Sequence, residues 1–373
     1  MLRLKGRVQV DTAWASDSDA ATSDGTPAGT RFGTDHRSEL RSIILSAQGE
    51  IRDWLRFRAG FVHVAGKNKL STTFVQFRQA GLRLTLGQLR EAVSMEEETG
   101  GTNINMMERA AFTDAWDFRR RLGVGLGYET SNFSLEAAIQ SDNVTQERGH
   151  RDRYVLGARV VYLPVAEKTR MVHLGIYGMS RRRERGHNIP SGPAVSYGQH
   201  PELHAIDQHF VETGPIAATG DRVVGVEFAG LYGPFNASAE AALLTVDSRV
   251  AGMSDPHFKG GYVEIGYFIT GESRPYRVRQ WSYVRPDNPI GAGGFGAVQI
   301  VFRIDHLDLQ SRRAGIFGGR QTAYLIGVNW HPIEYVKFMV NLGVIDIANA
   351  PNFRTPTGNN VVDILGLRGQ INW

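Results

Sequence analysis

The chain of 373 residues contains no cysteine and no long apolar run. The lack of cysteine excludes a small scaffold held by disulfides, and it suits a protein that crosses an oxidising compartment without needing them. No segment approaches the roughly 18 consecutive apolar residues that a membrane-spanning helix requires. A mean hydropathy of -0.26 does not exclude a membrane protein, because transmembrane strands alternate apolar with polar residues.

The excess of positive charge is also small, with 42 Lys+Arg against 38 Asp+Glu and a formal net charge of +4. The arginines are spread along the chain rather than gathered on one helix or tail, so we predict no nucleic-acid partner. Residues 2–7 have neither the apolar stretch nor the small-residue cleavage site of a signal peptide. For an exported protein, we therefore expect the signal peptide to be absent from this sequence.

Both ends of the chain alternate apolar and polar residues with the period of two that is typical of a β-strand. The apolar faces comprise Leu2, Leu4, Val8, Val10 and Trp14 at one end, and Leu365, Leu367, Ile371 and Trp373 at the other. The polar faces comprise Arg3, Lys5, Arg7, Gln9 and Asp11, and Arg368, Gln370 and Asn372. The same alternation recurs within 55–61, 82–86, 121–128 and 153–162.

About sixteen such segments can be traced, an even number, as closed bacterial barrels require. They span 2–14, 36–49, 52–64, 72–79, 82–90, 118–128, 132–141, 152–163, 170–181, 221–231, 235–247, 258–270, 294–306, 319–331, 334–347 and 361–373. The predicted fold class is all-β, a transmembrane antiparallel β-barrel of about sixteen strands with inward-folded loops. We expect residues 1–373 to form a single outer-membrane domain.

The connections alternate between short and long, as expected for short periplasmic turns and long outer loops. Short turns are predicted at 49–51, 130–132, 232–234 and 331–332, and long loops at 15–35, 91–117, 182–220 and 348–360. The connection 271–293 is long where the alternation requires a short turn. Either it folds into the lumen or the strand count shifts there.

A soluble β-sandwich would also show alternating strands, but its apolar faces would have to meet in a core. Aromatic residues near strand ends favour the barrel, because such barrels carry aromatic girdles at both membrane interfaces. The candidate girdle residues are Trp14, Trp54, Tyr128, Tyr162, Tyr267, Trp330 and Trp373.

Several short motifs resemble the phosphate-selective porins of Gram-negative outer membranes. They are Leu86-Gly87-Gln88-Leu89-Arg90, Met107-Glu108-Arg109-Ala110, Gly230-Leu231-Tyr232-Gly233-Pro234-Phe235, Gly266-Tyr267-Phe268-Ile269-Thr270-Gly271-Glu272-Ser273-Arg274-Pro275-Tyr276 and Gly327-Val328-Asn329-Trp330. The resemblance implies a homotrimer of sixteen-stranded barrels in the outer membrane, with inward-folded loops and an arginine ladder that leads anions to an eyelet. Near the first eyelet strand this family often has paired arginines, whereas here Ser42 follows Arg41.

Arginine suits phosphate because its planar fork donates two parallel hydrogen bonds and stays charged. Strand parity places a set of basic residues on the inward face, and the alternative for each is an ion pair with a neighbouring carboxylate. The candidates for anion binding on the wall are Arg41, Arg56, Arg58, Arg78, Arg83 and Arg121, with Arg159, Arg303 and Lys337, and those at the lumen entry are Arg3, Lys5 and Arg7. Few acidic residues are expected to face the lumen.

The loop 91–117 is long enough to fold inward and narrow the channel. Arg109 in this loop is the first candidate for the constriction, with a salt bridge to Glu108 or Glu96 as the alternative. Inward-facing glycines on the following strand, Gly123, Gly125 and Gly127, would leave room for the loop. They do not form a dinucleotide motif, because no helix start follows them.

The longest loop opens with a basic run that could collect anions at the channel mouth or contact lipopolysaccharide phosphates. This run contains Arg181, Arg182, Arg183 and Arg185. His200, His204 and His209 have metal-like spacing but no supporting carboxylate or thiol, and Asp17, Asp19 and Asp24 do not fit a calcium loop. The acidic run at 96–98 is expected to face solvent or cap a short helix, so we predict no metal and no cofactor.

The predicted function is an outer-membrane diffusion channel for anions, phosphate or polyphosphate foremost, that also contacts outer-membrane lipids. The alternatives are a general or weakly anion-selective porin and an outer-membrane barrel enzyme. An enzyme would need a nucleophile and a base within hydrogen-bond reach, whereas the histidines fall mainly in loops. A structural or adhesin barrel would have a plugged or neutral lumen.

Overall fold

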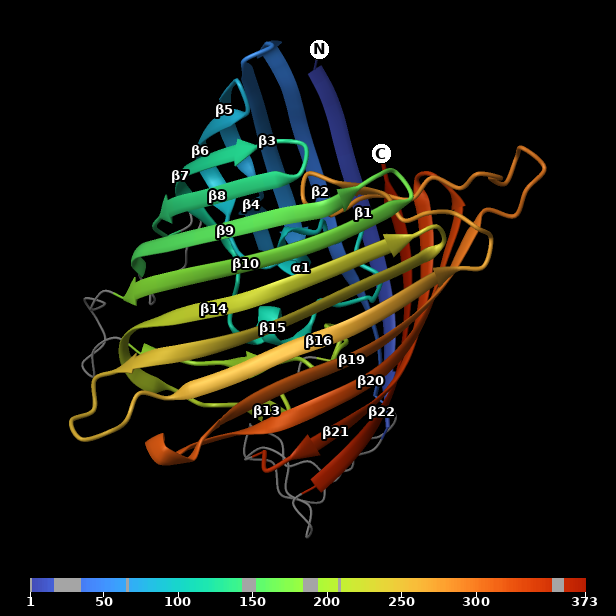
Figure 1. Cartoon of the computed structure of the whole chain (residues 1–373). Helices are drawn as coiled ribbons and strands as arrows, with labels where there is room; N and C mark the ends of the chain where they lie inside the picture. Colours follow the sequence, from blue (N-terminus) through green and yellow to red (C-terminus); the bar gives the residue numbers. More distant parts are fainter. Residues whose placement is uncertain are drawn as a thin grey trace.

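The computed structural model describes residues 2–16, 35–64, 67–142, 152–183, 194–206, 209–350 and 359–373. Antiparallel strands pair in sequence order around a ring, and the ring closes because the first strand, β1 (Leu2–Ala15), pairs with the last, β22 (Asn359–Asn372). Figure 1 shows these two strands side by side, blue against red, with both termini toward the same end of the barrel. Closure gives each long strand of the described wall a partner on both sides, as a membrane-spanning sheet requires.

The wall consists of sixteen strand positions, as the sequence predicts. The other strands are β2 (Asp35–Arg52), β3 (Leu55–Val64), β4 (Lys67–Leu70), β5 (Thr73–Gln79), β6 (Leu82–Arg90), β7 (Arg120–Glu129), β8 (Phe133–Gln140), β9 (Asp152–Ala166), β10 (Arg170–Arg183), β14 (Ile216–Tyr232), β15 (Phe235–Ser248), β16 (His257–Phe268), β19 (Ala297–Ser311), β20 (Ile316–Ile333) and β21 (Val336–Ala348). Because β4 and β5 both pair with β3, they count as one interrupted strand.

The alternation of short turns and long loops is confirmed, with two turns displaced. The turns at 130–132 and at Gly233-Pro234 lie where they were expected. The first turn is at Asp53-Trp54 instead of 49–51, and the last is at Glu334-Tyr335 instead of 331–332. In both cases the strand continues past the predicted end, because pairing with its neighbour outweighs the local turn preference of Gly49 or Pro332.

Apolar side chains cover the outside of the barrel. Leu4, Leu126 and Phe302 are 73%, 56% and 57% exposed, and each lies between inward-facing neighbours on its strand. Exposed residues of this kind occur on every long strand of the wall, as expected for a surface that contacts lipid. A sandwich would bury them, so the exposed apolar face excludes that alternative.

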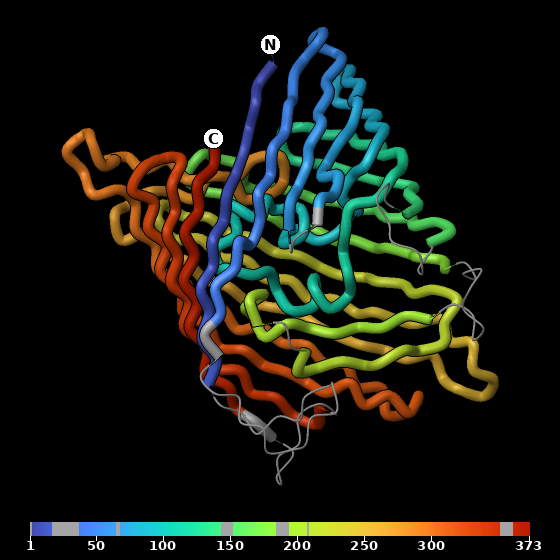
Figure 2. The backbone as a smooth tube through the Cα atoms, turned by 180° about the vertical axis from the view of Figure 1, so that it is seen from behind, coloured from blue at the N-terminus to red at the C-terminus, as the bar shows by residue number. Residues whose placement is uncertain are grey.

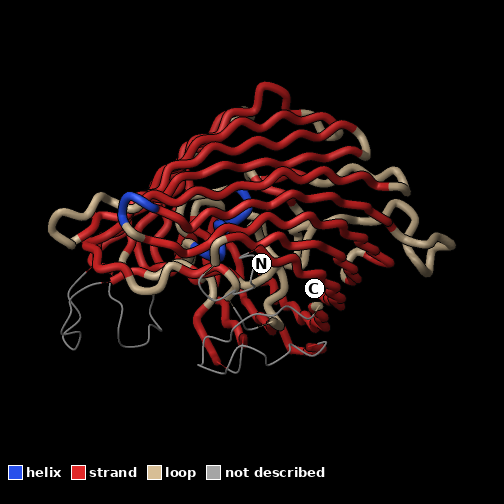
Figure 3. Tube along the Cα trace, turned by 90° about the horizontal axis from the view of Figure 1, so that it is seen from below, coloured by secondary structure: helices blue, strands red, loops and turns tan. Residues whose placement is uncertain are grey.

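The interior is not empty. The loop 91–119, with α1 (Met95–Glu98) and α2 (Ala111–Ala115), lies inside the ring of strands, where Figure 2 shows it in teal. Residues 194–206 and 209–215, called here segment 194–215, lie beside it in yellow-green and carry β11 (Ala194–Val195), β12 (Gly198–Gln199) and β13 (Val211–Glu212). Figure 3 shows the same arrangement from another side, with loop segments enclosed by a wall built from strands.

These two segments pack on the inward face of β14–β22 in an apolar core. Phe112, Trp116 and Phe118 form edge-to-face pairs, with ring centroids 5.3 to 6.4 Å apart, and all three are buried. Segment 194–215 adds Tyr197 and Phe210 to the same core. These two segments therefore fill the lumen along β14–β22 at the long-loop end. The remaining open space lies against β1–β3 and β5–β8.

The connection between β16 and β19 enters the lumen from the short-turn end. It forms a small hairpin, β17 (Tyr276–Arg277) and β18 (Gln280–Trp281), and the indole Nε1 of Trp281 donates to Ser238 Oγ on the inward face of β15 at 2.8 Å. Of the two alternatives for this segment, inward folding is correct, and the strand count does not shift. Elsewhere η1 (Arg312–Ala314) forms the connection from β19 to β20. Among the described residues, helices are too short to cross a membrane.

Candidate functional site

Backbone carbonyls of the loop 91–119 are held one after another by side chains of the barrel interior. Asn103 O accepts from Arg274 at 2.8 Å, and Ile104 O accepts from Lys337 of β21 at 2.7 Å. The remaining carbonyl contacts are Gly101 with Gln9, Thr102 with Gln370, Asn105 with Asn329, Met107 with Arg368 and Glu108 with Arg303. This series fixes the path of the loop across the lumen.

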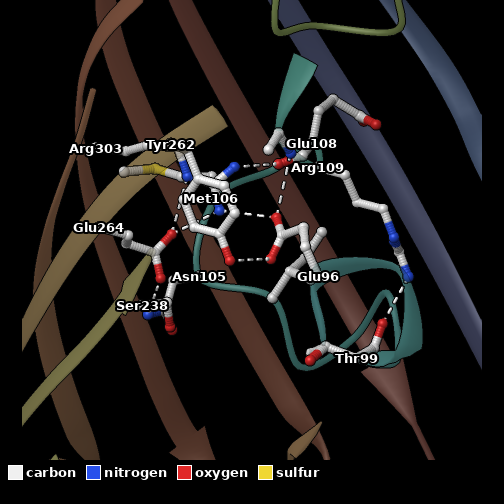
Figure 4. A network of polar contacts seen from close by, with 12 residues as sticks. Glu96, Thr99, Asn105, Met106, Glu108, Arg109, Ser238, Tyr262, Glu264 and Arg303 are labelled. Carbon is white, nitrogen blue, oxygen red and sulfur yellow. Dashed lines mark hydrogen bonds and ion pairs between the residues drawn. The ribbon is translucent and has the colours of Figure 1, made fainter. Parts of the chain in front are cut away.

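Carboxylates of the loop are paired with arginines of the wall. Glu108 accepts from Arg41 at 3.0 and 3.1 Å and from Arg368 at 2.8 Å. Burial alone would raise the pKa of Glu108, but the charges of Arg41 and Arg368 outweigh it and hold that pKa far below its usual range. Glu96 accepts from Arg303 at 2.9 Å, and Figure 4 shows this pair within a larger polar network. Such pairs anchor the loop.

A cavity of about 1050 Å³ lies between the tip of this loop and the wall formed by β1–β3 and β5–β8. Basic residues dominate its lining, which also includes Gly125 and Gly127. Of the described residues that line it, the basic ones are Arg3, Lys5, Arg7, Arg56, Arg58, Arg83, Arg90, Arg120, Arg277 and Arg285, and the acidic ones are Glu98, Glu136 and Glu334. A low-dielectric channel lined in this way attracts anions.

Arg7, Arg58, Arg90 and Arg120 are four of the six lining arginines that have no carboxylate within ion-pair distance among the described residues, and the other two are Arg3 and Arg277. Arg120 donates to Thr72 Oγ1 at 2.8 Å, and Arg90 donates to the carbonyl of Thr99 at 3.3 Å. The Nε atoms of Arg7 and Arg58 are buried without an acceptor in the described part of the chain. These guanidiniums thus carry positive charge that no described carboxylate pairs with at close range.

Arg109 lies beside this cluster, but it is also part of the loop's own support. Its Nε is 3.0 Å from a carboxylate oxygen of Glu97, and its Nη2 donates to the carbonyl of Thr99 at 2.6 Å. A Cβ atom built on Gly101 would lie 3.0 Å from Arg7 Nη1 and 3.7 Å from Arg109 Nη1. Two guanidiniums therefore converge on the loop tip at a glycine.

Most of the other wall arginines named from the sequence are engaged with carboxylates. The side chains of Arg121 and Arg181 are fully buried, the first with Glu91 and Asp152 and the second with Asp221. The remaining pairs are Arg41 with Glu108, Arg56 and Arg78 with Glu50, Arg83 with Glu129 and Glu136, Arg159 with Glu227, Arg182 with Asp247, Arg183 with Asp152, and Arg303 with Glu96 and Glu264. Arg185 lies outside the described residues.

The expectation of few inward acidic residues is wrong. Strands β14–β19 carry buried inward carboxylates, which are Asp221, Glu227, Glu240, Glu264 and Asp305. Parity identifies the inward face but not the charge balance on it, because acids on one strand pair with arginines on the next. Among the described wall strands that line the cavity, the arginines without a carboxylate partner lie on β1, β3 and β6 and at the start of β7.

Sequence reasoning did not select Arg90 and Arg120. Both stand at the junction of a strand with the loop 91–119, where the alternation of faces ends and parity no longer indicates direction. Arg90 was nevertheless within a family motif, and Arg120 stands in the run 119–121 of three arginines. A basic residue at each end of an inward-folding loop is the feature that could have identified them.

The histidines of segment 194–215 do come together, with ring centroids of His200 4.4 Å from His209 and 5.4 Å from His204. His200 contacts Asp114 and His204 contacts Glu39, each at 3.0 Å. Within the described ranges no group of three such residues is arranged to hold a metal ion. The acidic run 96–98 does not cap a helix but lies within the short helix α1, whose N-cap is Ser94. Glu96 and Glu97 are buried, so the expectation that the run faces solvent is also wrong for them.

Known proteins share both the sequence pattern and the fold. Residues 8–372 match the family described as phosphate-selective porin O and P. An uncharacterised protein of Caulobacter vibrioides is 32% identical over 384 residues, covering 100% of this chain and 74% of the relative. Porin O of Pseudomonas aeruginosa is 24% identical over 297 residues, covering 72% of this chain and 66% of the relative.

Solved outer-membrane porins have the same barrel. The anion-selective porin from Comamonas acidovorans aligns with a TM-score of 0.58 at 9% identity, covering 100% of this chain and 99% of the other. The outer-membrane protein OmpT of Vibrio cholerae gives 0.60 at 10% identity over 100% and 97% of the two chains. At such identities the likeness shows the fold alone. The family match over nearly the whole chain shows that this protein belongs to the phosphate-selective porin O and P family and is a channel of the bacterial outer membrane.

Proposed function

We propose that this porin is selective for anions and that it binds phosphate or a related oxyanion at the tip of the loop 91–119. The observation that carries the proposal is a group of guanidiniums around a cavity of about 1050 Å³, Arg7, Arg58, Arg90 and Arg120, which have no carboxylate partner in the described part of the chain. Transfer of an anion through a low-dielectric slab is costly unless fixed positive groups replace its hydration. These four residues supply such groups.

The ladder that leads to this site comprises Arg3, Lys5 and Arg56, which line the same cavity toward the short-turn end. Arg109 is assigned a double role, to support the loop through Glu97 and Thr99 and to present Nη1 beside Arg7. The proposed anion selectivity agrees with the names of two similar proteins, porin O and the anion-selective porin. Arg121 and Arg181 are left out of the site, since both are fully buried in ion pairs.

The alternatives are a general, weakly anion-selective porin and a barrel enzyme. A general porin would show anion preference without saturable phosphate binding, so binding measurements separate the two. The family match favours a channel over an enzyme.

For the assembly, we propose a homotrimer in contact with outer-membrane lipids and lipopolysaccharide. The trimer form of the similar OmpT structure supports this proposal.

The test is a planar-bilayer measurement on the purified porin. The reversal potential across a KCl gradient should indicate anion preference, and added phosphate should block the chloride current in a saturable manner. Arg120→Gln should weaken that block about tenfold, since a hydrogen bond to a charged group contributes roughly 1.5–3 kcal/mol. Arg222→Gln is the matched control, because Arg222 is exposed and paired with Asp247 away from the cavity. Cation preference, or phosphate block equal in Arg120→Gln and wild type, would overturn the proposal.

A further inference from the structure

The tip of the loop 91–119 is a tight turn held in one orientation. The N–H of Asn103 donates to the carbonyl of Gly100 at 2.7 Å, which places Gly101 and Thr102 at the two central positions. Their carbonyls are bound from the wall, by Gln9 of β1 at 3.4 Å and by Gln370 of β22 at 3.2 Å. Gln9 and Gln370 face each other on adjacent strands and are hydrogen-bonded to one another at 2.8 Å, so one pair of wall residues holds both peptide planes at the tip.

The orientation of these carbonyls determines the direction of two N–H groups. In a trans peptide unit the C=O and the following N–H point in opposite directions. Because the carbonyl of Gly101 points to Gln9, the N–H of Thr102 points away from Gln9. Because the carbonyl of Gly100 points into the turn, toward Asn103, the N–H of Gly101 points out of it.

Neither of these N–H groups has a hydrogen-bond acceptor within the described residues. Gly100, Gly101, Thr102 and Asn103 all line the cavity that also contains Arg7, Arg90 and Arg120. The loop tip thus combines two free backbone donors with guanidiniums that lack carboxylate partners. Consecutive free N–H groups of this kind form anion-binding concavities in proteins.

We propose that the backbone amides of Gly101 and Thr102 are direct ligands of the permeating oxyanion, and that together with Arg7, Arg90 and Arg120 they form its binding site. This inference rests on the proposed function of the channel. The guanidiniums attract every anion, whereas fixed N–H donors at two points favour an anion with several acceptor oxygens over a halide. The amides are therefore the determinants that distinguish phosphate from chloride.

Glycine at position 101 serves this arrangement. A side chain there would begin 3.0 Å from Arg7 Nη1 and would occupy space between that guanidinium and the loop. The backbone of Gly101 does not have a positive φ, since it is absent from the positive-φ positions of the chain. Proline, whose φ is near −65°, is favoured at the first central position of such a turn. It can therefore remove the N–H while keeping the turn.

The experiment compares Gly101→Pro with Gly101→Ala in planar bilayers, with inorganic phosphate as the probe. Both variants add a Cβ beside Arg7, and only proline removes the N–H. Gly101→Pro should weaken phosphate block about tenfold relative to Gly101→Ala, as expected for one hydrogen bond to a charged acceptor. The chloride conductance and reversal potential should be the same in the two variants, because no charge has changed.

Equal phosphate block in the two variants would overturn this inference while leaving the proposed function intact. If the wild-type porin shows no saturable phosphate block, that result overturns the proposed function itself. For the case in which Gly101→Pro does not assemble, Gln9→Leu is the second variant, because it frees the Gly101 carbonyl and lets the Thr102 N–H turn away from the cavity. It should weaken the block roughly fivefold, and an unchanged block in this variant would also overturn the inference.

Discussion

At the scale of single residues, an arginine's partner determines what it does. Arg120 and Arg121 are adjacent, yet Arg121 is fully buried between Glu91 and Asp152. Arg120 instead lines the cavity and, within the described residues, donates to Thr72 and to no carboxylate. A buried ion pair contributes to the local structure and leaves no net charge for a permeating ion. In the proposed function, the positive field at the loop tip comes from the described arginines that have no carboxylate partner, Arg120 among them.

Glu98 is the acidic residue of the loop tip that lines the cavity. Burial, and then the charge of Glu136 on β8, raises the pKa of Glu98 to about 7, while Arg90 on β6 and Arg159 on β9 lower it and the adjacent Glu97 raises it. A carboxyl with a raised pKa is neutral below that value and negatively charged above it. The channel lining thus loses net positive charge as the pH rises through about 7.

We predict that the anion-over-cation permeability ratio falls roughly twofold between pH 6 and pH 8, since one charge is added beside the ion path. Glu98→Gln should remove this dependence and keep the ratio at its pH 6 value. Reversal potentials measured across a fixed KCl gradient at each pH are the readout. A pH dependence that persists unchanged in Glu98→Gln would assign the titration to another group.

At the scale of elements, the loop 91–119 is attached in two different ways. Its tip is held by polar contacts to carbonyls, and its second half is held by apolar packing around Phe112. The wall makes space for this ring at Gly260 of β16, where a Cβ would lie 2.5 Å from Phe112 Cβ. The segment 269–296 contacts the same loop from the short-turn end of the barrel, where Arg274 donates to the carbonyl of Asn103.

We predict that Phe112→Ala loosens the loop and raises the single-channel conductance. Truncation of a buried phenylalanine costs about 3–5 kcal/mol of stability. Here the loss should weaken the packing of the loop against the wall, and the closed strand ladder should stay intact. Conductance traces should become noisier, and phosphate block should weaken. Phe302→Ala, which removes an outward-facing ring from β19, is the control and should leave the conductance unchanged. Unaltered conductance in Phe112→Ala would mean that the polar contacts alone hold the loop.

At the scale of the whole molecule, closure of the ladder from β1 to β22 leaves each long strand of the described wall paired on both sides. In lipid every backbone group must be paired internally, so a closed ladder opens only as a unit. We predict that the purified porin in mild detergent migrates faster on a gel before heating than after it, and that chemical cross-linking yields trimers. Unfolding without heat would contradict the stability of the barrel, and cross-linking to monomers only would contradict the trimer.

The barrel itself could be predicted from the sequence because its physical requirement is local and repeated. Each strand must present apolar residues to lipid at every second position, so Leu2, Leu4 and Leu367 reveal the outward face without any knowledge of the neighbouring strands. The number of strands and the alternation of turns follow from the same pattern. The turn at 53–54 was missed because the end of a strand depends on its partner's length as well as on local preference.

The candidate site depended on tertiary structure. The sequence identified Arg7, Arg58 and the loop 91–119, but not which arginines keep their charge, because Glu91, Asp152 and Glu227 lie far from their arginine partners along the chain. Nor does a sequence show the direction of a peptide plane, which Gln9 and Gln370 determine at the loop tip. Alternation along a strand is a local property, whereas charge compensation and donor direction arise only when distant segments meet inside the barrel.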